Sequence, residues 1–521
     1  MKSLLEAECW YAIFRIAITG KFTRMNKKTV VTAAFPFIPA ELCIAHFAST
    51  YLPADIIHRF ECLKGGNSIF VSATDVHGLW AQKELSQGQT TRDESMQSWH
   101  HRYLNEFRML GIEFTHYGRT DAKALQKLVY QSLNKLKADG AITQREADDY
   151  MCGDCGEVLP RRYRLAVKET SATGKEKIAY DELSDGNLQC RFCESENVIK
   201  DSKLHWFLDL QQGLATILDS IEQQKNLQVS TQLKSVVAEG LADWNISRDN
   251  YMGTKLPFSD EQSLYLWYES LIGYLYLAEC EGSNKSFTFK HFIGKNIIYY
   301  HGVVWPYLLH HGSDRKDCEL QISARGFLDM EKTDDALVNI ETLTSQYDKD
   351  YLRFYLAYRT PDSLSDYYFT KQDFTNTINQ IFCNQFGSFF RRCISIFQKN
   401  HLERVLPNEL ANTPWDNHWP QIEIALSQMQ VRSVLLHIQS YIKACGSVIE
   451  DLAIYRTPTM ESLGLLGELF IKALFLLAPI CPTRVQDFNI IAELDLSRLR
   501  PHDDCVGLLL NKTTARWEKI D

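Results

Sequence analysis

The sequence lacks an excess of basic residues, a dense cysteine framework and a long uncharged apolar run. Its 521 residues include 56 Lys and Arg against 65 Asp and Glu, a formal net charge of −9, which excludes a broad surface for non-specific nucleic-acid binding. Most of the 14 cysteines are widely scattered, which excludes a secreted disulfide scaffold and indicates a reducing, cytoplasmic location. With 45% hydrophobic and 23% charged residues, a soluble globular protein of several domains is expected.

Two apolar segments need a closer look because such runs can cross or target a membrane. Residues 463–481 contain Glu468 and Lys472 four positions apart, and this i, i+4 pair predicts a packed helix rather than a membrane span. Residues 9–19 are apolar but short and follow acidic residues, so no targeting signal is expected there. No membrane partner is therefore expected.

Strand and helix patterns alternate in the first part of the chain. The apolar, β-branched runs at 29–35 and 68–73 predict buried parallel strands. Residues 41–61 and 121–139 have the apolar spacing of amphipathic helices. The alternation predicts an α/β fold with a doubly wound parallel sheet.

The pattern changes twice along the chain. Residues 141–203 are polar and contain two cysteine pairs, and the α/β pattern resumes at 204–360. This interruption is expected of a domain inserted between the halves of one nucleotide-binding fold, whose first half is 29–140. Amphipathic helices dominate 361–521, which predicts a separate helical domain. Residues 1–28 are expected to be an N-terminal extension.

Four cysteines form two C-x-x-C pairs, Cys152 with Cys155 and Cys190 with Cys193. Four thiolates give the tetrahedral sulfur set that zinc prefers, and a two-residue spacer lets one turn present both sulfurs. Neither pair follows a strand at the start of a helix, which argues against a redox motif. The pairs predict a closed structural zinc site; the alternative is that they are coincidental free thiols.

Six further segments form an ordered pattern along most of the chain. The segments are Ala34-Phe35-Pro36-Phe37, Asp75-Val76-His77-Gly78, 240–249, 291–295, 300–306 and 347–355. Each segment alone is a weak signal, but their order and spacing are specific. Together they resemble the class I aminoacyl-tRNA synthetases, and among these the methionyl-tRNA synthetases.

This resemblance implies a Rossmann-type catalytic domain with a zinc-bearing insert, followed by a helical anticodon-binding-like domain. It also implies a reaction. The carboxylate of methionine or a related amino acid attacks the α-phosphate of ATP, giving an aminoacyl adenylate and pyrophosphate, and the acyl group then passes to tRNA. Such catalysis consists mainly of positioning and of stabilising phosphate charge. The implied cofactors and partners are structural zinc, ATP with Mg²⁺, the amino acid and tRNA.

The amino-acid pocket implied by the resemblance is largely kept. Asp75 matches the carboxylate that holds the substrate ammonium. Aromatic side chains match the lining around the methionine thioether, where sulfur–ring contacts are favourable, and ordinary core packing is the alternative for them. These side chains are Phe35, Phe37, Trp267, Tyr274, His301 and Trp305. Ser270 and Leu271 depart from the family's Ala-Pro, which leaves an analogue of methionine or another apolar amino acid open.

The first nucleotide-binding signature, H-x-G-H, is altered. Cys43-Ile44-Ala45-His46 occupies its place, so His46 is the one catalytic histidine that is kept. Cys43 cannot give phosphate the hydrogen bond of an imidazole, and Ala45 adds a Cβ where glycine allows close approach. Asn296 follows Gly294 and Lys295 where the family has an aspartate that contacts the ribose.

The second signature, K-M-S-K-S, is altered as well. The matching segment keeps Met330 and the catalytic Lys332 but has Asp329 and Glu331 in place of a cation and a hydroxyl. Two carboxylates in a loop that meets pyrophosphate are repulsive. The alternative is that other cations, such as Arg325, compensate for them.

The anticodon reader of the family is altered in the helical domain. Arg392 is kept and is expected to contact tRNA. Ser388 stands where a base-reading asparagine is expected, and residues 452–454 lack the tryptophan that stacks on an anticodon base. Specific reading of the CAU anticodon is therefore not expected.

Three functions are compatible with this pattern. The chain could be a synthetase homologue that acylates tRNA poorly. It could instead be a paralogue that transfers the activated amino acid to a small amine or thiol. The third possibility is a catalytically silent module that binds an amino acid or tRNA. We expect methionyl-tRNA synthesis to be impaired.

Overall fold

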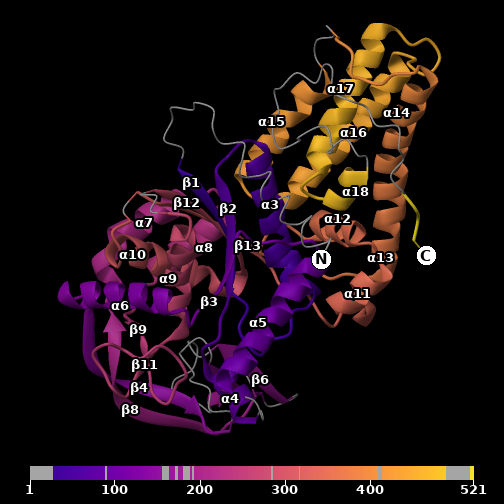
Figure 1. Ribbon diagram of the computed structural model, residues 1–521. Coiled ribbons are helices and arrows are strands. Elements are labelled where there is room, and N and C mark those ends of the chain that lie inside the picture. The colour runs from indigo at the N-terminus through magenta and orange to yellow at the C-terminus, as the bar shows by residue number, and fades with distance from the viewer. Residues whose placement is uncertain are drawn as a thin grey trace.

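The computed structural model describes residues 27–87, 91–154, 164–170, 174–179, 188–190, 193–282, 286–315, 317–408, 413–487 and 517–520. At its centre is a parallel sheet with the strand order β13-β12-β1-β2-β3 (Figure 1). Its strands are β1 (Lys28–Ala33), β2 (Ser68–Thr74), β3 (His116–Arg119), β12 (Phe287–Gly294) and β13 (Glu319–Arg325). The predicted doubly wound α/β fold is confirmed.

Both faces of the sheet are buried, as the continuous apolar runs predict. Val30 packs into the core on one face of the sheet and its neighbour Val31 into the core on the other, because successive side chains of a strand point to opposite faces. The predicted strand at 29–35 ends earlier, at Ala33.

Helices cover both faces of the sheet. On one face the helical run after β1 consists of α2 (Ile44–His46), the π-helix Phe47–Tyr51 and α3 (Leu52–Leu63), followed by α4 (Leu79–Gln87) and α5 (Arg92–Met109). The other face carries α6 (Lys123–Ala138), α7 (Leu214–Glu222), α8 (Leu227–Ala238), α9 (Leu266–Glu279), the π-helix Tyr300–Val304 and α10 (Trp305–His311). The predicted helices at 41–61 and 121–139 correspond to the first run and to α6.

The connections indicate where a ligand is expected to bind, at the carboxyl edge of the sheet. From β1 the chain proceeds through β2 to β3 on one side, and returns to β12 and β13 on the other side of β1. Ligands of open α/β sheets bind where the strand order reverses in this way, outside the carboxyl ends of the strands. The segments that leave β1, β2, β12 and β13 therefore meet at one site.

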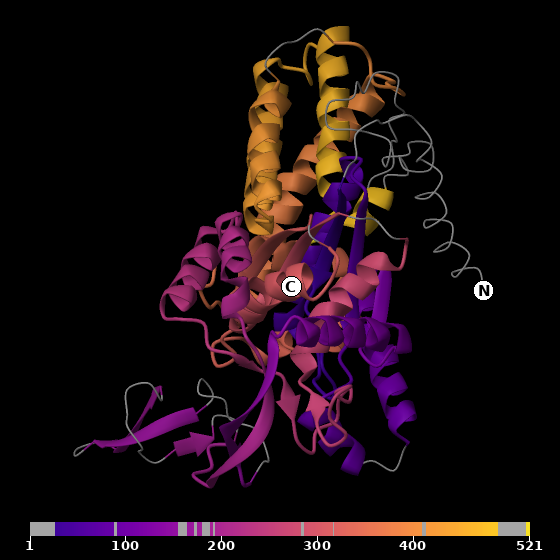
Figure 2. The same ribbon diagram turned by 90° about the vertical axis from the view of Figure 1, so that its left-hand side faces the viewer.

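The polar segment that carries the cysteine pairs forms a β-structure of its own. The long strands β4 (Ile142–Cys152) and β8 (Val198–Leu208) pair antiparallel, and β9 (Trp244–Asn245) joins β8. A smaller sheet contains β5 (Arg164–Thr170), β6 (Gly174–Ala179) and β7 (Leu188–Cys190). This region extends away from the central sheet, opposite the helical part (Figure 2). The short pair β10 (Ser247–Arg248) and β11 (Ser263–Leu264) precedes α9.

The C-terminal part is helical, as predicted, but its run of helices already begins before the expected boundary at residue 361. After the 3-10 turn Asp335–Leu337, its elements are α11 (Ile340–Gln346), α12 (Lys349–Arg359), α13 (Lys371–Asn376), the π-helix Thr377–Phe386, α14 (Gly387–Lys399), α15 (Pro414–Ser427), α16 (Val431–Asp451), α17 (Met460–Leu477) and α18 (Pro482–Asp487). Arg353 on α12 is buried and donates to Asp55 on α3 at 2.7 Å and to the Ile480 carbonyl at 2.8 Å, which ties the helical part to the sheet domain.

The apolar segment near the C-terminus is a packed helix, as its charged pair predicts. Glu468 and Lys472 form an ion pair on α17, whose other side chains are mostly buried. Among the residues that the structure describes, no helix is long and apolar enough to cross a membrane.

Candidate functional site

An aromatic cluster lies beside the carboxyl edge of the sheet. The ring of Phe35, just beyond β1, lies 4.6 Å from the ring of Tyr274 on α9. Tyr274 also lies 5.6 Å from His301 and 6.3 Å from Trp305. Sequence segments far apart thus bring four of the predicted pocket residues together.

The histidines of this cluster are neutral. Burial lowers the pKa of His301 to about 4. Its Nδ1 lies 3.0 Å from the Ile297 carbonyl and its Nε2 3.1 Å from the Tyr274 hydroxyl. The carbonyl can only accept, so Nδ1 carries the hydrogen and Nε2 accepts from the tyrosine. Burial also lowers the pKa of the adjacent His291. The cluster is therefore aromatic and uncharged.

Two buried polar atoms of the cluster are unpaired within the described structure, Nε2 of His291 and Nε1 of Trp305. Buried polar atoms normally have a hydrogen-bond partner. The mainly apolar cluster therefore contains two nitrogen atoms that are available to hydrogen-bond with a ligand.

The other two predicted pocket residues are placed differently. Trp267 stacks on Tyr300 with the rings 4.6 Å apart and reaches the cluster through His301, 6.0 Å away. Phe37 is 47% exposed and lies outside the buried cluster, although its backbone bridges to that of Asp75.

Asp75 lies directly after β2 and is buried. Its Oδ2 accepts from the Ser270 hydroxyl at 2.8 Å. Its Oδ1 accepts from the Thr120 hydroxyl at 3.2 Å and from the His77 backbone N–H at 3.3 Å. Ser270, which departs from the family pattern, thus holds the carboxylate in place. The contact between Ser270 and Asp75 could not be predicted from the sequence, because no local pattern links the two residues.

The ionisation of Asp75 is strongly perturbed. Burial, with the charge of nearby Glu269, raises the pKa of Asp75 to about 6. Glu269 itself accepts from Nδ1 of His77 at 2.5 Å and from the Thr254 hydroxyl at 2.6 Å. Burial opposes the charged form of His77, but Glu269 outweighs it and raises the pKa of His77. A buried ion pair therefore stands behind the Asp75 carboxylate.

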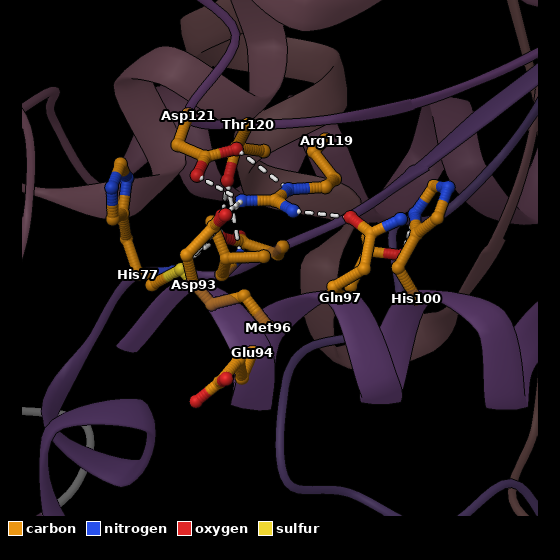
Figure 3. A network of polar contacts seen from close by, with 12 residues as sticks. His77, Asp93, Glu94, Met96, Gln97, His100, Arg119, Thr120 and Asp121 are labelled. Atoms are coloured by element: carbon orange, nitrogen blue, oxygen red, sulfur yellow. Dashed lines mark hydrogen bonds and ion pairs between the residues drawn. The ribbon is translucent and has the colours of Figure 1, made fainter. Parts of the chain in front are cut away.

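The segment after β3 that carries Thr120 is braced by Arg119. This guanidinium donates to Asp121 at 2.6 and 2.9 Å and to Gln97 on α5 at 2.8 Å. Figure 3 shows Arg119 between these two residues, with Thr120 beside them. Because bidentate arginine pairs fix geometry, the network holds Thr120 where it can donate to Asp75.

The segment that replaces the first nucleotide signature begins the helical run after β1. Cys43 is the N-cap residue, and its side chain accepts from the backbone N–H of His46 while the His46 ring accepts from the backbone N–H of Cys43. Cys43 Sγ lies 3.3 Å from Nδ1 of His46. Ala45 is half-buried in the first turn. The departure from the family pattern thus creates a close cysteine–histidine pair.

Gly294 and Asn296 lie where β12 ends. A Cβ at Gly294 would come within 2.9 Å of the Asn296 side-chain oxygen, so a larger residue there would displace that side chain. Lys295, between them, donates to Asp366 at 2.6 Å. Asn296 is exposed at the carboxyl edge, and the neighbouring cation is paired.

An ion pair within the loop that replaces the second nucleotide signature stabilises this loop. Lys332 donates to the Asp329 carboxylate at 2.6 Å. That hydrogen bond lowers the pKa of Asp329 and raises the pKa of Lys332. Met330 is 47% exposed. Asp334 accepts from the backbone N–H of Lys371 at 2.6 Å, so its carboxylate serves the start of α13.

Three cations near the carboxyl edge have carboxylate partners. Arg325, at the end of β13, is buried and donates to Asp362 at 3.2 Å. Together with the lysine pairs above, the ion pairs are Arg325–Asp362, Lys295–Asp366 and Lys332–Asp329. The sequence could not show these partners, because two of them come from residues far along the chain.

Three cysteines of the insert come together. The thiol sulfurs of Cys152, Cys190 and Cys193 lie within 4.8 Å of one another, and those of Cys152 and Cys193 are 3.4 Å apart. Thiolates around one zinc ion lie about 3.8 Å apart when each zinc–sulfur distance is about 2.3 Å, so the three sulfurs fit a metal. Cys155 lies outside the described residues.

Arg392, the predicted tRNA contact, is paired. It forms an ion pair with Glu450 of α16, and both side chains are partly exposed. Its neighbour Arg391 donates to the Ser388 hydroxyl at 3.1 Å. The charge of Arg392 is therefore balanced on the surface of the helical part.

Comparison with known sequences identifies relatives of this chain. The family model described as tRNA synthetases class I (M) matches residues 29–394. The chain is 28% identical over 393 residues to the methionine–tRNA ligase of Methanocaldococcus jannaschii, covering 70% of this chain and 59% of that protein. It is 25% identical over 464 residues to that of Myxococcus xanthus, covering 82% of this chain and 66% of the relative. The chain thus spans 59–66% of these relatives' length.

A solved structure shares the whole architecture. The Mycobacterium tuberculosis methionyl-tRNA synthetase bound by methionyl-adenylate superposes with a TM-score of 0.72 at 17% identity, covering 94% of this chain and 99% of that chain. Its free form gives a TM-score of 0.72 at 16% identity. At this identity the similarity shows the fold.

Proposed function

This chain belongs to the class I tRNA synthetases (M), and from that membership we propose that it binds methionine or a closely related amino acid and activates it with ATP as an aminoacyl adenylate. The observation that carries the proposal is the buried carboxylate of Asp75 at the carboxyl edge of the sheet, which contacts Ser270 one helical turn from Tyr274 of the aromatic cluster and lies close enough to influence the pKa of Tyr274. The methionine–tRNA ligases among its relatives support the choice of amino acid.

In the proposed complex, Asp75 binds the substrate ammonium and the aromatic cluster encloses the apolar side chain. A buried carboxylate pairs strongly with an ammonium ion, and a thioether makes favourable contacts with rings such as Phe35 and Tyr274. The substrate carboxylate oxygen then attacks the α-phosphorus of ATP. The bond from that phosphorus to the bridging oxygen of pyrophosphate breaks, and Mg²⁺ bound to ATP offsets the phosphate charge.

We further propose that the ATP step is slow. Phosphoryl chemistry depends on cations aimed at the charge that develops in the transition state. Lys332 must leave Asp329 before it can bind pyrophosphate, and Arg325 and Lys295 are held by other carboxylates. The pairing supports impaired activation rather than its absence.

Transfer to tRNA is proposed to be weaker still. Arg392 would have to leave Glu450 to contact a nucleic acid, and Ser388 does not replace a base-reading amide. An acceptor other than the cognate tRNA, such as a small amine or thiol, is therefore the second candidate. A catalytically silent module is the third, and the ATP exchange assay described in the Discussion separates it from the first two.

The pH dependence of methionine binding tests the role of Asp75. Its pKa of about 6 means that the carboxyl group is mostly protonated at pH 5 and mostly ionised at pH 7. Only the ionised form attracts an ammonium, so we expect affinity to be about tenfold higher at pH 7 than at pH 5. Calorimetric titration across this range gives the Kd, and binding near pH 6 should release a proton. Affinity that is flat or falls with rising pH would contradict this role.

For the insert we propose a structural zinc ion held by Cys152, Cys190 and Cys193, with Cys155 as the fourth ligand. The three described sulfurs support the site by their spacing. Closed thiolate sites of this kind stabilise small folds and perform no chemistry. Zinc-binding thiolates must stay reduced, which fits the reducing cytoplasm, where we propose that the protein works.

Replacing Cys190 by serine tests this site. We expect zinc content, measured by plasma mass spectrometry, to fall from about one ion per chain to near zero, and the insert to become sensitive to protease, because a lost thiolate removes most of the binding free energy. Cys280→Ser, at an exposed cysteine, is the matched control and should keep its zinc. Full zinc retention by Cys190→Ser would refute the site.

A further inference from the structure

The pair formed by Cys43 and His46 has the geometry of an activated nucleophile. The thiol Sγ lies 3.3 Å from Nδ1 of His46, within the 4.0 Å reach of a sulfur hydrogen bond. The backbone N–H of Cys43 donates to the same Nδ1 at 3.1 Å, so Nδ1 is the nitrogen that carries the lone pair and can accept the thiol hydrogen. A thiol within hydrogen-bond reach of an unprotonated imidazole nitrogen is an arrangement used in covalent catalysis.

The surroundings of the thiol favour its ionised form. Partial burial opposes ionisation, but the side-chain hydrogen bond and charge of His46 and the backbone N–H groups of Ala45 and His46 outweigh it, so the pKa of Cys43 is lowered. Helical residues continue without a break from Ile44 to Leu63, so the helix dipole adds to the effect. Elsewhere on the same helical run, burial raises the pKa of Cys62 to about 12.

The pair lies where an acyl phosphate would bind. The pair begins the first helix after β1, at the point where the strand order reverses. The N-terminus of a helix in this position is suited to bind phosphate. The backbone N–H of Ile44 donates to the Val338 carbonyl at 3.0 Å, which fixes the pair next to the loop after β13. An adenylate with its ammonium on Asp75 and its phosphate at this helix would have its acyl carbon between the two.

A second group lies near the thiol. Tyr367 is 7% exposed, and burial raises the pKa of its hydroxyl, with a smaller contribution from the charge of Cys43. Ser49 is close enough to that hydroxyl to oppose the increase, although no hydrogen bond of ordinary distance is formed in the described structure. The tyrosine hydroxyl can therefore donate to a ligand oxygen near the thiol.

We propose that Cys43 accepts the aminoacyl group from the aminoacyl adenylate as a thioester, with His46 as the base. The thiol proton passes to Nδ1 of His46, which gives up the hydrogen bond from the Cys43 backbone N–H as it takes the proton, and Sγ attacks the acyl carbon. The bond from that carbon to the phosphate oxygen breaks, and AMP leaves with the electron pair. The products are an aminoacyl thioester on Cys43 and AMP, and no oxidant or reductant is needed. The inference rests on the proposed function, because the adenylate is the acyl donor.

A thioester intermediate would suit transfer to an amine or thiol. The acyl group would be held on the protein after AMP has left, and a second nucleophile could then take it without a tRNA. The altered signature would in this case be a gain of an acyl carrier and not merely a loss of an ATP contact.

The test supplies synthetic methionyl adenylate directly to the full chain, so that it does not depend on ATP activation. The acid-quenched protein is weighed intact, and thioesters are identified by their lability to neutral hydroxylamine. We expect one hydroxylamine-labile methionyl group on the wild type and on Cys62→Ser, none on Cys43→Ser, and at least about tenfold slower formation on His46→Gln. Serine and glutamine preserve a capping box, so both test variants keep the helix start.

A thiol titration provides a second readout that a merely structural cap would not affect. The alkylation rate of Cys43 by iodoacetamide should rise at a lower pH than that of an ordinary thiol, and His46→Gln should move this rise to higher pH.

Absence of the labile adduct on the wild type, or its equal formation on Cys43→Ser, would overturn the inference even if ATP exchange is active. Formation of the adduct from supplied adenylate by a chain without ATP exchange would leave the inference standing and refute the proposed function.

Discussion

Replacing Asp75 by asparagine is expected to raise the Kd of methionine by about a hundredfold or more at pH 7.5. The change removes the charge that pairs with the substrate ammonium but keeps the size of the side chain. Removing one partner of a buried ion pair typically costs about 3 kcal/mol or more, which corresponds to a hundredfold in affinity. Calorimetric titration with methionine measures the loss.

The control for this variant is Asp93→Asn. Asp93 carries the same group, but its side chain is 87% exposed and pairs with Arg119 at 3.1 Å, so methionine binding should be unchanged. Thermal unfolding separates binding from folding, because burial already disfavours the charge of Asp75 and asparagine should not lower the Tm. Wild-type affinity in Asp75→Asn would show that another group binds the ammonium.

Replacing Asp329 by asparagine is expected to accelerate ATP–pyrophosphate exchange by about threefold to tenfold. The substitution breaks the ion pair that holds Lys332 at 2.6 Å and removes a negative charge from the loop. A released lysine can donate to the pyrophosphate leaving group, and because the pair is exposed the gain is limited to the small free energy that such a pair contributes. Exchange of labelled pyrophosphate at saturating methionine measures the gain.

The double variant Asp329→Asn with Lys332→Met distinguishes the two causes of this gain. If release of the lysine is responsible, the second substitution should cancel the acceleration. A full gain in the double variant would instead attribute the effect to the lost carboxylate. Exchange that does not change in Asp329→Asn would contradict the view that this ion pair limits the ATP step.

Much of the fold could be predicted because its signals are local. The continuous apolar runs of β1 and β2 indicate strands buried on both faces, and the spacing in α6 indicates its buried side. The long antiparallel pair of β4 and β8 was not predicted. These strands lie within a polar segment, and their partners are tens of residues apart in sequence, so no local pattern marks the pairing.

The site shows the same division between local and distant contacts. The cysteine–histidine pair could have been found from the sequence, because positions i and i+3 of a helix start are neighbours and form a capping box. By contrast, Lys295 meets Asp366, and Asp75 meets Ser270, through contacts between elements far apart in the chain. A sequence indicates which charges are present, but folding decides which of them are neutralised.

This distinction changes the meaning of the altered nucleotide signatures. From the sequence, Asp329 and Glu331 are two added repulsions near pyrophosphate, and Asp334 follows in the same loop. In the structure, Asp329 binds Lys332 and Asp334 binds the start of α13. We therefore expect the ATP step to be slow mainly because Lys332 is held by Asp329. One substitution can release this lysine.

The most direct test of this account is methionine-dependent ATP–pyrophosphate exchange, measured side by side on this chain and on the Methanocaldococcus jannaschii methionine–tRNA ligase. We predict exchange that saturates with methionine on both proteins and that is slower on this chain by at least about tenfold. A lack of methionine-dependent exchange on this chain would contradict the proposed activation of methionine. An exchange rate equal to that of the relative would contradict the proposal that the paired cations slow the ATP step.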